Sequence, residues 1–191
     1  MSEPSRLAVA LLHHPVLDRR GDIVTTSVTN VDLHDIARIS RTYGAEPFYA
    51  VTPVAAQQDM IRRVTGHWVS GWAARVGHPR TEALQRLHVC SSLSEARIDY
   101  EARVGGPVSV AVTGASLSRD LTTFAGLRTA IREGRSGPIL LLFGTGWGLG
   151  PEVVDAADLR LEPIRGGTDF NHLPVRAAVA IALDRLVGPG I

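Results

Sequence analysis

The chain has 191 residues, 45% of them hydrophobic, and a formal net charge of +1. This length suits one domain with a sizeable core, and the chain lacks the long uncharged apolar run that a membrane-spanning helix needs. A single cysteine, Cys90, excludes an intrachain disulfide and a multi-cysteine zinc site. All 20 lysine or arginine residues are arginines, which excludes a lysine nucleophile within the chain and favours phosphate contacts. Glu3 and two early histidines argue against a signal peptide, so we expect a cytoplasmic protein.

Strand and helix patterns alternate along the first half. A buried strand is predicted at residues 7–12, and a short extended segment at 23–27. Thr29 and Asp32 have the spacing of a capping box, which predicts a helix that Gly44 ends. A strand at 48–51 and a helix from about 55 to 74 follow. The apolar stripe of that helix consists of Met60, Val64, Trp68 and Trp72.

The alternation continues to the C-terminus. We expect a strand at 87–90, a helix capped by Ser92 and Glu95, a strand at 108–113, a loop to 118 and a helix from there through 132. The apolar run at 138–143 suits a buried parallel strand, and helices are predicted from 151 and over 175–186. Together these elements predict an α/β fold with a mostly parallel sheet and helices on both faces.

A glycine-rich loop, FGTGWGLG, occupies residues 143–150. Its glycines are Gly144, Gly146, Gly148 and Gly150, and without a Cβ they allow the backbone to approach a ligand closely. A phosphate-binding P-loop needs a lysine after its last glycine, but Pro151 stands there. The dinucleotide fingerprint also fails, because Leu149 occupies the place of its third glycine. A nucleotide-dependent oxidoreductase of Rossmann type is therefore a disfavoured alternative.

Three stretches resemble the SPOUT class of S-adenosylmethionine-dependent RNA methyltransferases. They are TNVDLHDIARISRTYGAEPFYAV at 29–51, FGTGWGLGPEVVDAADLRLEPI at 143–164 and FNHLPVRAAVAIALDRL at 170–186, and a small bacterial subgroup of unassigned substrate is similar in its FGTGWGL and NHL pattern. The resemblance implies one domain over 1–191 with a trefoil knot at about 108–188. It also implies S-adenosylmethionine as the cofactor, tRNA or rRNA as the substrate, no metal, and a homodimer.

The resemblance also implies roles for individual residues. Arg38 takes the place of the class's catalytic arginine, and Asn30 and Arg41 would contact the RNA. The residues expected to bind the cofactor are Thr113, Gly114, Phe143, Gly144, Thr145, Gly146, Ile164, Gly166, Asn171, His172 and Leu173. Apolar walls against the adenine would come from Phe143, Leu149 and Leu173. The other histidines are expected to be structural.

Two departures from the class pattern leave a second alternative open. Asn30 and Asp32 flank the usual position of an asparagine, and Thr145 follows Gly144 where the class often has a glutamate. A catalytically silent dimer that binds RNA or cofactor would fit these departures. In either case the broad apolar stripe of the last helix, with small alanines along it, favours a contact with a second copy of the chain over packing on its own sheet alone.

Overall fold

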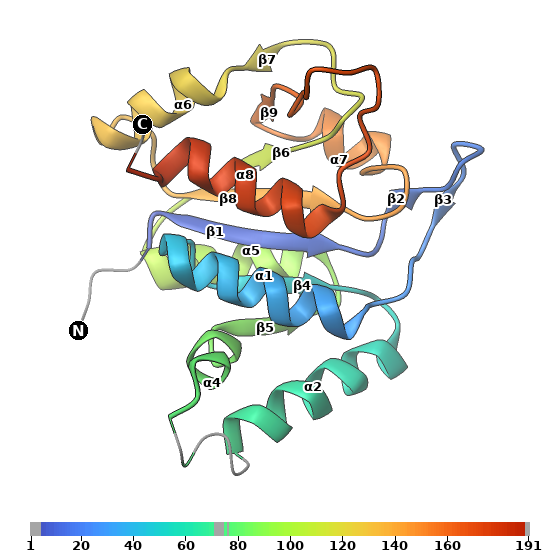
Figure 1. The fold of residues 1–191 in the computed structure, drawn as a ribbon, viewed down its shortest axis with the longest axis vertical. Coiled ribbons are helices and arrows are strands. Elements are labelled where there is room, and N and C mark those ends of the chain that lie inside the picture. The colour runs from blue at the N-terminus through green and yellow to red at the C-terminus, as the bar shows by residue number, and fades with distance from the viewer. Residues whose placement is uncertain (1–4, 71–74, 76, 190–191) are drawn as a thin grey trace.

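The computed structural model describes residues 5–70, 75 and 77–189 (Figure 1). Within them, seven strands form one sheet in the order β5-β4-β1-β8-β6-β9-β7, and every pairing in it is parallel. In chain order these strands are β1 (Leu7–Leu12), β4 (Phe48–Val51), β5 (Leu87–Cys90), β6 (Ser109–Val112), β7 (Leu121–Thr122), β8 (Ile139–Gly144) and β9 (Leu159–Leu161). A separate antiparallel hairpin consists of β2 (Val16–Leu17) and β3 (Ile23–Val24). The prediction of a mostly parallel sheet is confirmed.

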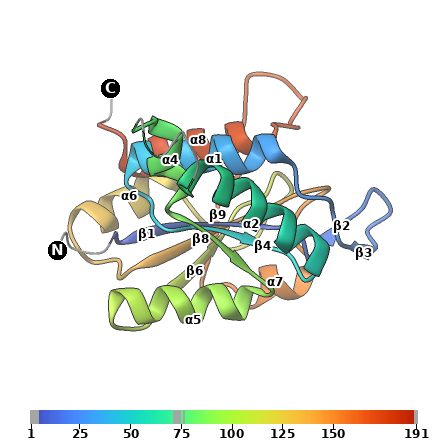
Figure 2. The ribbon, with the colours of Figure 1, turned by 90° about the horizontal axis from the view of Figure 1, so that it is seen from below.

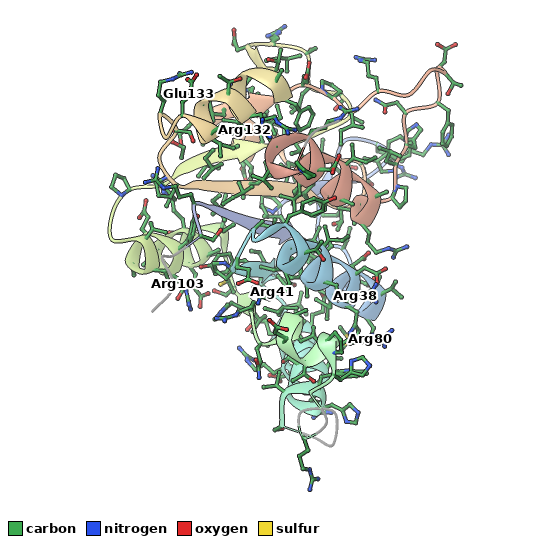
Figure 3. The ribbon with its side chains drawn as sticks, turned by 60° about the vertical axis from the view of Figure 1, so that its left-hand side comes forward. Arg38, Arg41, Arg80, Arg103, Arg132 and Glu133 are labelled. Atoms are coloured by element: carbon green, nitrogen blue, oxygen red, sulfur yellow. The ribbon has the colours of Figure 1, made fainter. Side chains whose placement is uncertain are left out.

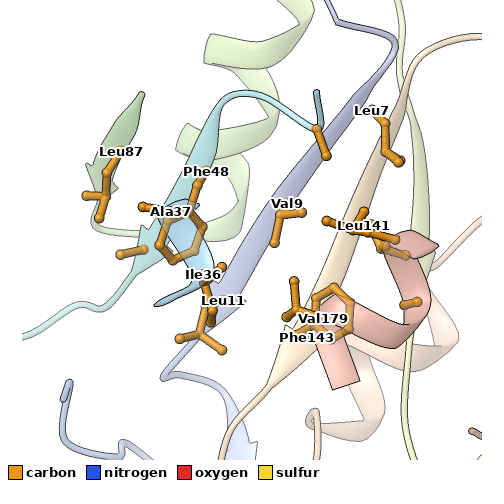
Figure 4. Close-up of a cluster of buried hydrophobic side chains, with 14 of the residues drawn as sticks. Leu7, Val9, Leu11, Ile36, Ala37, Phe48, Leu87, Leu141, Phe143 and Val179 are labelled. Carbon is orange, nitrogen blue, oxygen red and sulfur yellow. The ribbon is translucent and has the colours of Figure 1, made fainter. Parts of the chain in front are cut away.

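Helices cover both faces of the sheet (Figure 2). They are α1 (Asn30–Tyr43), α2 (Ala55–Ser70), α4 (Pro79–Leu84), α5 (Leu93–Val104), α6 (Phe124–Arg132), α7 (Pro151–Asp155) and α8 (Val175–Val187). Successive side chains of a strand point to opposite faces, so Leu7, Val9 and Leu11 of β1 join a core with α1 and α8 (Figure 4). Ala8, Ala10 and Leu12 join a second core with α5 and α7.

Strands β1 and β8 lie at the centre of the sheet, and they end at the same edge as their parallel neighbours β4 and β6. Their register runs from Leu7 opposite Ile139 to Leu12 opposite Gly144, and both strands are buried almost throughout. A run of apolar residues without alternation is expected for strands covered on both faces. Because parallel strands end at the same edge, the segments that follow β1, β6 and β8 lie close together there.

The predicted boundaries of α1 are confirmed. The Thr29 hydroxyl accepts a hydrogen bond from the Asp32 amide and caps the first turn. Gly44 adopts the left-handed conformation that ends the helix, with φ 65°. The capping of α5 by Ser92 is confirmed in the same way.

Four short elements differ from the prediction. Residues 121–122 form strand β7 beside β9, so the helix expected from 118 begins only at Phe124. Strands β2 and β9 and helix α4 were not predicted, whereas β3 lies within the extended segment expected at 23–27. Two- and three-residue strands carry no periodicity of their own, and only their pairing with another segment defines them. The last predicted residues of the helix from 55, including Trp72, lie outside the described part of the chain.

The apolar stripe of α8 is covered by the chain itself. Val179, Ala182, Leu183 and Leu186 are fully buried in the core shared with α1 and the sheet. The Arg128 side chain from α6 also donates a hydrogen bond of 2.7 Å to the Gly188 carbonyl just beyond the helix. The width of this stripe therefore reflects intrachain packing and gives no support to a dimer contact.

Candidate active site

A cavity of about 960 Å³ opens at the edge of the sheet where β1, β6 and β8 end. Its walls come mainly from residues 113–116, 143–148 and 171–175, together with residues 26, 27, 29 and 32 on the approach to α1. This volume lies at the upper end of the range of about 300–1,000 Å³ found for small-molecule sites. The cavity is therefore large enough for a cofactor the size of a nucleoside with a side chain.

Ten of the eleven residues expected to bind the cofactor line this cavity. They are Thr113, Gly114, Phe143, Gly144, Thr145, Gly146, Ile164, Asn171, His172 and Leu173. Gly166 does not line it, and Leu149 is also absent from its walls, because the Leu149 side chain packs into the core on the α5 side of the sheet. The structure thus brings four parts of the chain, up to 60 residues apart, to one cavity, and their cofactor-binding role stays a prediction.

The glycines of the 143–150 loop are needed for contacts within the chain. A Cβ on Gly144 would lie 2.9 Å from the backbone nitrogen of Leu149, and one on Gly146 would lie 2.7 Å from the Leu17 carbonyl oxygen. Gly146 also has φ +58°, a conformation that side chains disfavour. The Trp147 amide donates a hydrogen bond of 2.9 Å to the same Leu17 oxygen. The loop is therefore shaped by its own turn and by strand β2.

A partly buried chain of hydrogen bonds links the cavity wall to the end of strand β1. The Thr145 hydroxyl donates to the Leu12 carbonyl at 3.2 Å, and the Thr145 and Thr26 hydroxyl oxygens are 2.5 Å apart. Because Thr145 has only one proton to donate, Thr26 donates to Thr145 and accepts from Nδ1 of His13, 3.1 Å away. The His13 proton therefore resides on Nδ1.

His13 is fully buried and neutral. Burial lowers the pKa of His13 from 6.5 to about 4, although the nearby negative charge of Asp32 opposes this shift. The Nε2 atom has no hydrogen-bond partner among the described residues. A positive charge on this ring would have neither solvent nor an ion pair, so His13 supports the site as a neutral hydrogen-bond donor.

We expect the unprotonated His13 to make stability depend on pH. Its folded pKa lies below the unfolded value, so the unfolded chain binds more protons between pH 4 and 6.5. Stability from this group is complete above pH 6.5 and is lost as the pH falls toward 4, by up to about 3 kcal/mol. Urea unfolding at a series of pH values should show this loss in the wild type and a smaller one in His13→Asn. Parallel curves for the two proteins would contradict the assignment.

A second group, not predicted from the sequence, joins α1 to α8 at the cavity wall. The Asp32 carboxylate accepts a hydrogen bond from the Thr29 hydroxyl at 2.5 Å. It also forms an ion pair with Arg176, whose Nη1 atom is 3.2 Å away. Nε of Arg176 lies 3.4 Å from Asp35. Asp32 lines the cavity and is 8% exposed. Since 144 residues separate the partners, no local pattern could have shown this pair.

The residues expected to act on the RNA lie outside the cavity. The Arg38 side chain is 50% exposed and its Nη1 is 4.0 Å from Asp35 (Figure 3). Arg41 contacts Glu46 at 3.3 Å and forms an ion pair with Glu82 of α4. Asn30 is an exposed residue at the start of α1. Arg41 thus holds α4 against α1, whereas Arg38 is available for a further contact.

The charges on the cavity walls are negative. Asp32 and Glu162 line it, and no arginine is among its described lining residues. The Oε1 atom of Glu162 accepts a hydrogen bond of 2.8 Å from the Phe124 amide, and this bond holds the carboxylate at the start of α6. No group of three or more histidine, cysteine, aspartate or glutamate side chains is placed to hold a metal in the described part of the chain. None of the described helices is long and apolar enough to cross a membrane.

Comparison with known proteins gives consistent results for family and fold. A family described as SAM-dependent RNA methyltransferase matches residues 6–188. An uncharacterized protein from Aquifex aeolicus is 39% identical over 178 residues, which cover 93% of this chain and 86% of that protein. A protein from Nitratidesulfovibrio vulgaris named tRNA (guanine-N(1)-)-methyltransferase is 40% identical over 188 residues, or 98% of this chain. The present chain spans only 43% of that relative's length.

A solved structure shows the same fold at low sequence identity. The SpoU methyltransferase AviRb from Streptomyces viridochromogenes, in complex with the cofactor AdoMet, superposes with a TM-score of 0.60 at 16% identity. The match covers 98% of this chain and 58% of AviRb. Family and fold agree with the resemblance seen in the sequence, and the chain belongs to the S-adenosylmethionine-dependent RNA methyltransferases, with the SPOUT fold.

Proposed function

We propose that the cavity binds S-adenosylmethionine and that this chain methylates a transfer RNA at a site completed by a second copy of the chain. The observation that carries this proposal is the convergence of ten residues, singled out by the resemblance, on one cavity. The choice of tRNA rests on the name of the Nitratidesulfovibrio relative. In the same proposal, residues 1–191 form one domain and about 108–188 form the knot.

The residues of the cavity fit the cofactor chemically. S-adenosylmethionine supplies an electrophilic methyl group on a positively charged sulfur. The carboxylate of Glu162 on the wall suits such a cation, whereas the charge of Asp32 is offset by its ion pair with Arg176. Phe143 offers an apolar surface to the adenine, and the backbone of Ile164 and Leu173, which also line the cavity, can satisfy its polar edge.

The acceptor RNA needs a positive group that the cavity walls do not supply. Arg38 lies six residues beyond Asp32, about 9 Å further along the axis of α1 at about 1.5 Å per residue. Its guanidinium is half exposed and has only a long contact with Asp35. We therefore assign Arg38 to the cavity of a partner subunit, where it would orient a phosphate or the acceptor group.

We expect the purified protein to transfer a labelled methyl group from S-adenosylmethionine to unmodified tRNA transcripts. Transcripts of tRNA and of rRNA fragments should be compared, with the RNA recovered and digested to nucleosides. The guanine N1 atom named for the relative is the first position to examine, because a methyl group there blocks the base-pairing edge and stops primer extension. Transfer to rRNA alone would overturn the tRNA assignment, and no transfer to any RNA would overturn the proposal.

A further inference from the structure

Three aromatic rings lie together at the mouth of the cavity. Trp147, Phe170 and His172, here called the aromatic rim, come from the loop after β8 and the loop before α8. The Trp147 and His172 rings are 5.8 Å apart and the Phe170 and His172 rings 5.3 Å, both edge to face. Figure 1 shows both loops on the side of the molecule where the hairpin β2–β3 projects. The rim is thus one cluster built from two segments.

The rings of the rim are exposed although hydrogen bonds hold both of its loops to the rest of the chain. Trp147 is 55% exposed and Phe170 75%, while Leu149 in the same loop as Trp147 is buried. The Trp147 amide is held by the Leu17 carbonyl, and the Asn171 side chain donates to the Ala115 carbonyl at 3.4 Å. The hydrogen-bonded backbone therefore holds these rings in contact with solvent, where they bury little surface in the core. Exposed apolar side chains gathered in this way indicate a binding site.

The rim also adjoins the cavity that we propose to hold the cofactor. Trp147 and His172 line the cavity, and Phe170 extends the cluster outward from His172. An enzyme that does chemistry on a base acts on a single-stranded substrate or takes the nucleotide out of its base stack, and the second route loses stacking energy. Aromatic side chains replace that stacking for any base, because every base has a π-face.

We propose that the aromatic rim stacks an unpaired nucleobase of the acceptor RNA and so holds the target nucleotide at the cavity. This inference rests on the proposed function, since it names how the RNA meets the same site. The rim recognises single-stranded or splayed-out nucleotides and not the sequence of a duplex. Phe170 and the outer face of Trp147 contact the base, whereas the deeper walls remain for the cofactor.

The test measures RNA and cofactor binding separately in the full chain. Trp147→Ala and Phe170→Ala should each weaken binding of a single-stranded oligoribonucleotide by about tenfold, and raise KM for tRNA with little change in kcat. Trp147→Phe should retain most of the affinity, because it keeps an aromatic face. The matched control is Ile98→Ala on α5, which removes a side chain that is 63% exposed on the other face of the sheet.

Tryptophan fluorescence gives a direct reading of the contact. Binding of the oligoribonucleotide should quench the emission of the wild type, and Trp147→Phe should lose most of this quenching while it still binds. The same oligonucleotide annealed into a duplex should bind more weakly and quench less. Since this measurement needs no methyl transfer, it tests the rim even if the tRNA assignment fails.

Three results would overturn the inference. Unchanged RNA affinity in both alanine variants would show that the rim does not contact RNA. A loss of S-adenosylmethionine affinity as large as the loss of RNA affinity would assign the rings to the adenine. Sedimentation of Trp147→Ala or Phe170→Ala as a monomer, beside a dimeric wild type, would assign the rim to a contact between two copies.

Discussion

Replacing Gly144 with valine should abolish binding of S-adenosylmethionine. A Cβ at this position would lie 2.9 Å from the Leu149 nitrogen and 3.0 Å from the Gly148 carbonyl carbon, so the turn after β8 cannot keep its shape. Both Thr145 and Gly146 on the cavity wall belong to that turn. We expect the dissociation constant measured by calorimetry to rise at least about 100-fold, equivalent to about 2.7 kcal/mol.

The matched control is Gly166→Ala. Gly166 has open space where a Cβ would stand, its φ is not in the left-handed region, and it does not line the cavity. Its affinity for the cofactor should equal that of the wild type. Urea unfolding of both variants separates a reshaped loop from an unfolded chain. If a folded Gly144→Val protein still binds the cofactor with the wild-type affinity, this loop is not part of the cofactor site. If Gly166→Ala loses affinity for the cofactor, Gly166 does belong to that site.

Features set by neighbours in the chain could be predicted from the sequence. The cap at Thr29 and the end of α1 at Gly44 follow from residue types a few positions apart. The buried runs of β1 and β8 were visible because both faces of these strands are covered. Motifs then identified ten lining residues of the cavity, because each motif lies at the end of a strand or the start of a helix at one edge of the sheet.

Features that depend on distant pairing could not be predicted. Strand β7 exists because it pairs with β9, and the ion pair between Asp32 and Arg176 joins two helices across the chain. The reason for Gly144 and Gly146 also differs from the expectation. Their missing Cβ atoms make room for the loop itself and for β2, so the glycine pattern reports intrachain packing at least as much as ligand contact.

The family assignment argues against the oxidoreductase that the sequence left as an alternative, whereas the methyl-transfer assay decides whether the chain is catalytically silent. A match to RNA methyltransferases over residues 6–188 is not expected of an oxidoreductase, and it agrees with the absence of the dinucleotide fingerprint. The sequence differs from the SPOUT pattern near Asn30 and at Thr145, where the class often has a glutamate. The site still contains carboxylates despite these differences. Asp32 and Glu162 line the cavity from segments outside the glycine loop.

Removing Arg38 should reduce kcat at least about 100-fold while the affinity for S-adenosylmethionine stays within about twofold of the wild type. The reason is geometric, because Arg38 lies outside the cavity of its own chain and cannot contact a cofactor held there. Arg62→Ala is the matched control, since Arg62 is similarly exposed and pairs with Asp59 at i−3, as Arg38 does with Asp35. A parallel loss of cofactor affinity and thermal stability in Arg38→Ala would show a structural role instead.

Mixing two inactive variants tests whether Arg38 serves the partner subunit. In a heterodimer of Arg38→Ala and Gly144→Val, the first chain keeps an intact cavity and the second keeps its arginine. If the active site combines both chains, one of the two sites in each heterodimer is complete. Equal amounts after subunit exchange should then recover about a quarter of the wild-type activity. If Arg38 acts within its own chain, every heterodimer site lacks one part and the mixture stays inactive. Sedimentation of the wild type provides the second measurement: an active monomer at micromolar concentration would contradict the shared site, whatever the mixture shows.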